Sequence, residues 1–328
     1  MRRREFITLA GGAAVAWPLA ARAQQPASPV IGVLWPVSAA AAVRNIAALR
    51  QGLRDLGYRE GGNLAVEYRF ADGVTERLAT LAAELIALRP ALVLVGSTSG
   101  VVAARSVTAM VPLLMLGASE DPVRLGLVES FSHPGGNVTG FLLSADAGIV
   151  GKRLGLLRDA VPGIARVGVV ANPDAAGDAA ELMMLPSIAE RLGLQYRVFE
   201  VRTRDELERV FAAIARADLQ ALYLSWTPVL NVHRAHVTSL VAKLRLPAVY
   251  GFREFVQAGG LMSYGPDLPD LYRRSASYVD KILKGEKPSV LPVQLAEKYE
   301  LVINLNAAKA LGLNISEAFL LLADEVIE

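Results

Sequence analysis

Short apolar runs alternate with longer helical patterns from residue 30 to residue 264, and this rhythm limits the folds that are open to the chain. Val30–Trp35 has the length and composition of a buried strand, and residues 39–56 are typical of an amphipathic helix that ends at Gly57. Strands that alternate with helices form parallel sheets covered by helices on both faces. The predicted fold class is therefore α/β.

The two halves of the chain follow the same plan. Three pairs of matching features lie 135 or 136 positions apart: Trp35 and Ala171, Leu56-Gly57 and Leu192-Gly193, and Pro112 and Pro247. A repeated offset favours two lobes of similar structure, although any α/β chain produces some coincidences of this kind.

Residues 113–141 join the two halves. This stretch starts as an apolar strand, continues through a polar loop at 117–122 and reaches the breaker Pro134-Gly135-Gly136. Open α/β sheets bind ligands at the carboxyl ends of their strands, where such loops lie. We therefore expect two lobes around a cleft, with a first lobe over 29–141 and a second over 142–264.

Residues 1–25 are predicted to be an export signal that is not part of the fold. Arg2-Arg3-Arg4 precedes a weakly apolar stretch rich in Gly and Ala, and Ala21-Arg22-Ala23 forms a small-residue cleavage site. The modest hydrophobicity of the core fits a twin-arginine-type signal, and a basic tail without targeting function is the less favoured alternative. We expect cleavage near Ala23 and a periplasmic mature protein.

Composition excludes several classes of function. The formal charge is +2, and four arginines and one glutamate lie in residues 1–23, so the remaining chain carries about −1 and has no basic stretch for nucleic acid. The absence of cysteine excludes disulfides, thiol catalysis and a cysteine-linked lipid anchor. After residue 25 no apolar run approaches the ~20 residues of a membrane span, so stable membrane insertion is not expected.

The strand ends that are predicted to face the cleft carry aromatic and hydroxyl side chains. Trp35 and Trp226 each follow a strand, one in each lobe, so they are placed to sandwich a ligand between apolar faces. Ser97, Thr98 and Ser99 lead into a helix, where hydroxyls and free backbone amides suit a carboxylate. Each feature has a plainer interpretation, because a serine at a helix start is often only a cap and a tryptophan often fills a core.

Candidates for catalysis or metal binding are weak. His233 and His236 lie one helical turn apart, but no third ligand of a known motif accompanies them. Residues 96–100 lack the lysine of a phosphate-binding loop, and no Gly-x-Ser-x-Gly turn follows a strand. We therefore expect no catalytic residues, no metal and no cofactor, and we predict that the chain is not an enzyme.

Short segments across essentially the whole chain carry a family resemblance. They are residues 17–25, 134–140, 252–255, 259–265, 282–288, 291–294, 300–304 and 307–313. With them the chain resembles a large bacterial family of ABC-transporter substrate-binding proteins. The resemblance implies a type I periplasmic binding protein fold, in which two Rossmann-like lobes with parallel sheets are joined by a hinge of three crossings. In that scheme about 265–292 return to the first lobe, and about 293–328 are associated with the second.

The resemblance also implies roles for individual residues. Family members with assigned ligands include binders of aromatic amino acids, whose loops hold the carboxylate with hydroxyls and backbone amides. On matching positions Ser97, Thr98 and Ser119 would bind a carboxylate, and Asp121 and Glu254 are candidates for an ammonium group. The plainer interpretations are that Asp121 caps a helix after the next residue and that Glu254 is a solvated helix residue.

Asn172, Trp226 and Tyr264 would line the wall of the second lobe. The first loop, Trp35-Pro36-Val37, is bulkier and less polar than the resemblance leads us to expect. This departure argues against an ordinary amino-acid pose and favours a flat or smaller ligand.

The function implied by the resemblance is that of the solute-binding component of an ABC importer. We expect a monomer that captures a small, aromatic or carboxylate-bearing solute and presents it to a membrane permease. The solute would favour a closed arrangement because only there do both lobes contact it. An exported sensor that presents the same solute to a receptor is the alternative, and the sequence does not separate the two.

Overall fold

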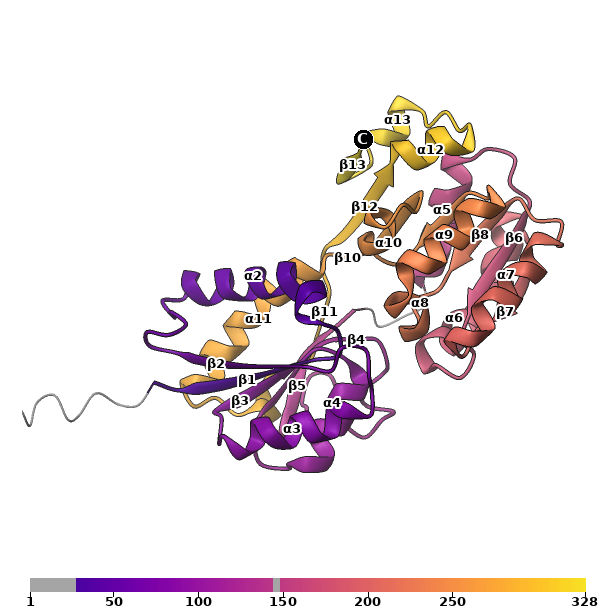
Figure 1. Ribbon diagram of the computed structural model, residues 1–328. Helices are drawn as coiled ribbons and strands as arrows, with labels where there is room; N and C mark the ends of the chain where they lie inside the picture. Colours follow the sequence, from indigo (N-terminus) through magenta and orange to yellow (C-terminus); the bar gives the residue numbers. More distant parts are fainter. Residues whose placement is uncertain (1–27, 144–147) are drawn as a thin grey trace, which may run out of the picture.

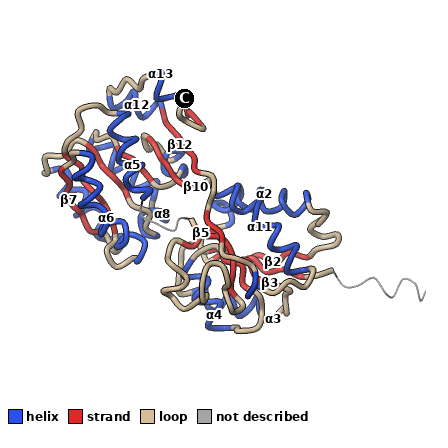
Figure 2. Tube along the Cα trace, turned by 180° about the vertical axis from the view of Figure 1, so that it is seen from behind, coloured by secondary structure: helices blue, strands red, loops and turns tan. Residues whose placement is uncertain are grey.

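The computed structural model describes residues 28–143 and 148–328, which form two lobes (Figure 1). Each lobe contains a largely parallel sheet between layers of helices, as the view from behind also shows (Figure 2). This confirms the predicted α/β class with two Rossmann-like lobes. The predicted signal at 1–25 lies outside the described residues. Within the described part of the chain, no helix combines the length and apolar character needed to cross a membrane.

The first lobe is built on a six-stranded sheet with the order β11-β5-β4-β3-β1-β2, in which all neighbours are parallel. Its strands are β1 Val30–Trp35, β2 Ala65–Phe70, β3 Leu92–Val95, β4 Leu113–Ala118, β5 Val138–Leu142 and β11 Gln294–Leu295. β3, β4 and β5 are buried throughout, because helices cover both faces of the sheet.

Two pairs of helices cover this sheet. α2 packs against α11 on one face, and α3 packs against α4 on the other (Figure 1). These helices are α2 Ala39–Asp55, α3 Arg77–Ala87, α4 Thr98–Val107 and α11 Leu268–Leu283. The Tyr58 hydroxyl donates to Asp280 at 2.9 Å, which ties the end of α2 to a helix that comes from a distant part of the chain.

The second lobe is built on a seven-stranded sheet with the order β13-β12-β10-β9-β8-β6-β7. Only the β10–β12 pair is antiparallel among the described strands of this sheet. Its strands are β6 Arg166–Ala171, β7 Gln195–Glu200, β8 Ala221–Leu224, β9 Ala248–Tyr250, β10 Met262–Pro266, β12 Tyr299–Asn304 and β13 Glu325–Ile327. The order β7-β6-β8-β9-β10 repeats the order β2-β1-β3-β4-β5 of the first lobe, as the repeated offset in the sequence predicted.

Successive residues of the second sheet face different helices. Val167 and Val169 belong to the apolar cluster under α5 and α6, whereas Val170, Leu222 and Leu224 belong to the cluster under α7 and α9. The longer helices are α5 Gly148–Ala160, α6 Ala176–Leu192, α7 Leu207–Ala215 and α9 Arg234–Leu244. The short helices of both lobes are η1 Arg204–Glu206, α8 Pro228–Val232, α10 Arg253–Gln257, η2 Pro288–Val290, α12 Leu305–Leu311 and α13 Glu317–Leu320.

The chain passes between the lobes three times. It crosses between residues 143 and 148, returns after β10 and crosses again between β11 and β12. Gln294 and Leu295 of β11 pair with Phe141 and Leu142 of β5, so the hydrogen bonding of the first sheet continues a few residues past 292. The connections place the carboxyl ends of both sets of strands at the junction of the lobes.

Candidate functional site

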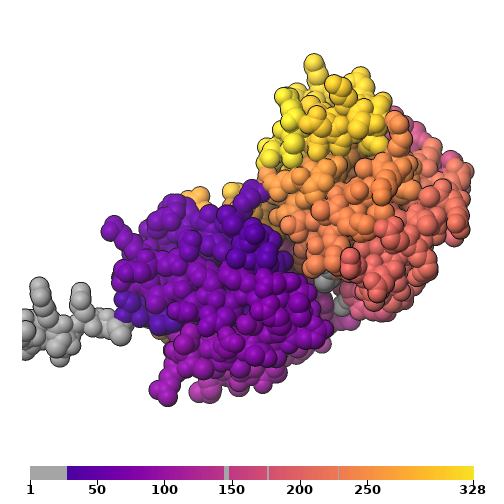
Figure 3. All heavy atoms as spheres, in the orientation of Figure 1, coloured from indigo at the N-terminus to yellow at the C-terminus, as the bar shows by residue number. Residues whose placement is uncertain are grey.

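Two adjoining cavities lie where the lobes face each other, and both are lined by Leu143, Trp226 and Phe252. The larger has a volume of about 300 Å³ and is called the polar cavity, because Ser119, Asp121, Arg153, Asp178 and Glu181 lie in its wall. The smaller, of about 150 Å³, is called the aromatic cavity and is walled by Trp35, Tyr272 and Trp226. The space-filling view shows the two lobes as separate masses that meet along a narrow groove (Figure 3). Such a junction is a usual place for a small ligand.

The aromatic cavity brings together the two tryptophans that the sequence singled out. Trp35 ends β1 and stacks on Tyr272 of α11 with ring centroids 4.9 Å apart, and it is 2% exposed. Trp226 follows β8 and packs against Phe252 at 5.0 Å. Trp226 is only partly buried, so its ring is the more available to a ligand.

The helix start after β3 both caps itself and borders the aromatic cavity. Ser97 is the N-cap of α4, and its Oγ accepts a hydrogen bond from the Gly100 amide at 3.0 Å. Ser97 and Ser99 line the aromatic cavity. Thr98 is buried and lines neither cavity, and its Oγ1 accepts from the Ser119 amide at 3.2 Å. Thr98 therefore positions the loop after β4.

The acidic candidates lie in different cavities. Ser119 and Asp121 line the polar cavity, and Glu254 of α10 lines the aromatic cavity. Asp121 Oδ1 accepts from the amides of Val123 and Arg124 at 2.8 and 3.4 Å. Asp121 thus closes a turn where the sequence predicted a helix, because the segment after it makes only turns.

Asn172 and Tyr264 line neither cavity. Asn172 Oδ1 accepts from the Asp174 amide at 3.0 Å, and its own amide donates to Asp178 at 2.7 Å. Tyr264 of β10 stacks on Tyr299 with ring centroids 5.8 Å apart, beside the second and third crossings. Both residues lie behind the second-lobe wall of the cleft.

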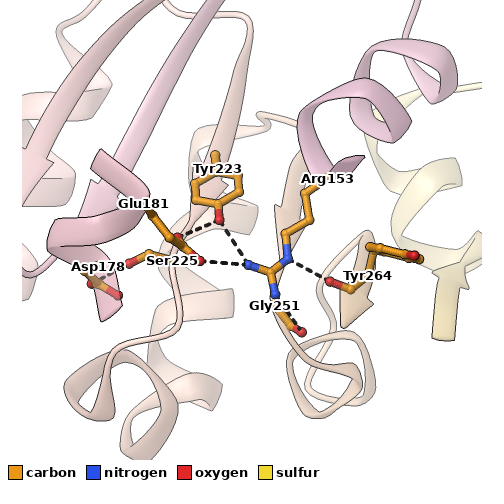
Figure 4. Close-up of polar contacts among 7 residues, drawn as sticks. All are labelled: Arg153, Asp178, Glu181, Tyr223, Ser225, Gly251 and Tyr264. Atoms are coloured by element: carbon orange, nitrogen blue, oxygen red, sulfur yellow. Dashed lines mark hydrogen bonds and ion pairs between the residues drawn. The ribbon is translucent and has the colours of Figure 1, made fainter. Parts of the chain in front are cut away.

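The polar network in this wall centres on Arg153 of α5, which is 3% exposed (Figure 4). Its Nε donates to the Tyr264 carbonyl at 2.7 Å, and its Nη2 reaches the Gly251 carbonyl at 3.5 Å. Its Nη1 donates to Tyr223 Oη at 3.0 Å and to Glu181 at 3.3 Å. Burial raises the pKa of Tyr223 well above its ordinary value, so this phenol stays protonated and donates to Glu181 at 2.7 Å. The network fixes α5, α6 and three strands together.

This network was not predicted from the sequence. Arg153 follows Lys152 in a helical pattern, where two adjacent cations indicate a solvated face. Its burial results from packing against β8, β9 and β10, which lie 70 to 111 residues away in sequence. No local signal in the sequence identifies such a contact.

Asp178 lies in the first turn of α6 and is 2% exposed, and it lines the polar cavity. Its Oδ2 accepts from the Asn172 amide at 2.7 Å. It also accepts from Ser225 Oγ at 2.7 Å (Figure 4). Burial raises the pKa of Asp178 from 3.8 to about 7, and the two hydrogen bonds oppose that rise. The side chain is therefore held in one place but is only partly ionised at neutral pH.

The two lobes approach each other closely at the edge of the polar cavity. A Cβ atom placed on Gly177 of α6 would lie 3.8 Å from both the carbonyl oxygen and Oγ of Ser119, which follows β4 of the first lobe. The hydroxyl and carbonyl of Ser119 thus lie opposite the first turn of α6. The arrangement offers polar groups from both lobes in one cavity and aromatic rings in the next.

The described residues contain no group of three or more His, Cys, Asp or Glu side chains arranged to hold a metal ion. His236, one of the histidines considered in the sequence, lies 3.0 Å from Glu208 on the neighbouring helix α7. The polar groups of the cleft include hydroxyls, carboxyls and guanidinium groups, and the guanidinium of Arg153 is already bonded within the protein. This set can hold a polar solute by hydrogen bonds and charge.

Comparison with known proteins relates the chain to solute-binding proteins. Residues 30–327 match the family model described as ABC transporter substrate binding protein. A curated tyrosine-binding protein from Clostridioides difficile is 23% identical over 263 residues, which cover 80% of this chain and 75% of the relative. A solved ABC domain in complex with L-Trp from Streptococcus pneumonia has a TM-score of 0.82 and 25% identity, and the match covers 92% of this chain and all of that one. A conserved domain protein from Vibrio cholerae has the same TM-score and coverage at 26% identity.

Proposed function

Because the chain belongs to the ABC transporter substrate-binding protein family, we propose that it captures a small aromatic solute bearing a carboxylate and presents it to a membrane permease. A substrate-binding protein of a transporter holds its solute without converting it, so the chain is not an enzyme. We further propose that it works outside the cytoplasm, after cleavage of the export signal near Ala23.

The observation that carries the proposed ligand class is the pair of adjoining cavities that share Trp226 and Phe252. An aromatic ring fits against Trp226 in the aromatic cavity, while the polar end of the same molecule reaches the polar cavity. The Trp-bound and tyrosine-binding relatives support this division, because both amino acids join an aromatic ring to a polar end.

Binding is proposed to couple to closure of the lobes. Both cavities are lined by residues from both lobes, so a solute makes its full set of contacts only while the lobes face each other. A ligand shifts a two-state equilibrium only by its difference in affinity for the two states, and this arrangement supplies that difference. The closed surface is what a permease can distinguish from the open one.

Calorimetric titration of the protein beginning at Gln24 with L-tryptophan and L-tyrosine tests the proposal. We expect binding of at least one of them, and Trp226→Ala should weaken it at least tenfold because a stacked aromatic wall is lost, a change of about 1.4 kcal/mol. The control is Tyr196→Ala, which removes an exposed aromatic ring on β7 that lines neither cavity. Equal affinity of the Trp226→Ala variant and the wild type would remove the aromatic cavity from the proposal.

The proposed location has a separate test. Expression of the full chain with its own first 25 residues, followed by fractionation, should yield a periplasmic form that starts near Gln24. Replacement of Arg3 and Arg4 by Lys should leave the chain uncleaved if the twin-arginine route is used. Cleavage of the lysine variant at the wild-type rate would exclude that route.

A further inference from the structure

The polar cavity has a charged wall on its second-lobe side that its own residues do not neutralise. Arg153 and Glu181 form an ion pair at 3.3 Å, and both are partly or fully shielded from solvent. Asp178 lies beside them in the same wall and is 2% exposed. Within the described part of the chain Asp178 has no ion-pair partner, because the guanidinium of Arg153 is bonded to other acceptors.

A buried carboxylate without a counter-ion is costly, and a cation that enters the cavity would remove that cost. The geometry of Asp178 suits such a contact. Both of its hydrogen bonds, from Asn172 and Ser225, go to Oδ2, so the carboxyl is oriented by the protein while it borders the cavity. Burial is the main cause of its raised pKa, and the nearby Arg153 opposes that rise only in part.

A second acceptor lies across the gap. Gly177 precedes Asp178 in the chain. A Cβ placed on Gly177 would lie 3.8 Å from both the carbonyl oxygen and Oγ of Ser119. An ammonium group has three donors, so it can bond acceptors from both lobes at once. Arg124 also lines the polar cavity from the first lobe, and it offers a cation to a ligand carboxylate there.

We propose that Asp178 accepts the ammonium group of the solute and thereby selects α-amino acids over carboxylic acids of the same shape. This inference rests on the proposed function, because it assigns one end of the solute that the cleft would hold. It differs from the assignment of the ammonium to Asp121 or Glu254. Asp121 is exposed and its Oδ1 already closes a turn, and Glu254 lies in the aromatic cavity.

A purely structural role for Asp178 makes a different prediction. Asp178 joins the loop after β6 to the end of β8 through its two hydrogen bonds. Asn at this position keeps an oxygen that can accept from both donors but carries no charge. If Asp178 were only a structural link, Asp178→Asn would leave the preference between ligands unchanged.

The test is titration of the wild type, Asp178→Asn and the control Asp159→Asn at pH 8; Asp159 is an exposed residue of α5 that lines neither cavity. The ligands are L-tyrosine or L-tryptophan, whichever binds more tightly, and its analogue without the amino group, 3-(4-hydroxyphenyl)propionate or indole-3-propionate. We expect the wild type and Asp159→Asn to prefer the amino acid at least tenfold. Asp178→Asn should lose that preference through weaker binding of the amino acid.

An unchanged preference in a folded Asp178→Asn protein overturns the inference but leaves the proposed function standing. A wild type that binds neither amino acid overturns both. If Asp178→Asn does not fold, the inference can still be tested on the wild type alone, through the protons that are released when the ligand binds. Binding near pH 7 should release protons when the amino acid holds Asp178 in its ionised form, and binding of the deaminated analogue should not.

That proton count comes from calorimetry in buffers of different ionisation enthalpy. The charged groups that face Asp178 are Glu181 and Arg153 in its own lobe and Glu120, Asp121 and Arg124 across the cavity. Equal proton release with both ligands would contradict the inference.

Discussion

Replacing Asp178 by Asn removes a buried carboxyl whose pKa is raised from 3.8 to about 7 by folding. Below pH 3.8 the carboxyl is mostly protonated in the folded and unfolded chains alike, so its ionisation does not change the free energy of unfolding. As pH rises from there to about 7, only the unfolded chain releases the proton, and the free energy of unfolding falls. At 1.36 kcal/mol per pKa unit, the full loss is roughly 4 kcal/mol above pH 7.

The assay is urea unfolding of the ligand-free protein at pH 5 and pH 8, followed by far-UV circular dichroism. Between pH 5 and pH 8 the free energy of unfolding of the wild type should fall by about 3 kcal/mol more than that of Asp178→Asn. The reason is that the two pH units from 5 to 7 lie between the pKa of the unfolded chain and the raised pKa of the folded one, and each unit costs about 1.36 kcal/mol. Asp178→Asn itself should show little of this loss, because it lacks the buried carboxyl. The same pH dependence in the wild type and in Asp178→Asn would refute the claim that folding buries this carboxyl without a counter-ion.

Two further predictions test the geometry. A Cβ on Gly177 would lie 3.9 Å from Ser119 Cβ, and the chain has no cysteine, so Ser119→Cys with Gly177→Cys should form a disulfide between the lobes. Oxidation should slow ligand exchange at least tenfold and reduction should restore it, whereas free thiols after oxidation would show that the lobes do not meet there. Gly140 has φ of 139°, and a Cβ on it would lie 2.0 Å from the Met115 carbonyl oxygen, so Gly140→Ala should cost at least about 2 kcal/mol in urea unfolding. Gly155→Ala, in α5 with open space around its Cβ position, should be neutral or stabilising, and similar costs for both variants would contradict the strand pairing.

The arrangement of strands and helices was largely predictable, because it follows from periodicity along the chain. The apolar run at Val30–Trp35 and the helix that ends before Gly57 were found from local pattern, and Gly57 has the left-handed φ of 89° that such a helix end favours. The duplication was visible in the sequence as matching features 135 or 136 positions apart, and the two lobes do repeat the same strand order. These features depend on residues that are close in sequence.

The site was less predictable, because its walls come from distant segments. Trp35 was a reasonable candidate, but no local pattern indicates that Tyr272 of α11 returns to stack on it. Arg153 and Asp178 resemble ordinary helix residues, and only the packed lobe shows that both are buried. Long-range packing decides burial, and burial decides which charges matter to a ligand.

The proposed solute lies between the lobes with its ring at Trp226 and its amino group at Asp178. A crystal structure of the protein grown with L-tyrosine or L-tryptophan tests this arrangement most directly. We expect the ring against Trp226 and the amino nitrogen about 3 Å from a carboxyl oxygen of Asp178. A ligand bound outside the two cavities, or one whose carboxylate and not its amino group points toward Asp178, would contradict it.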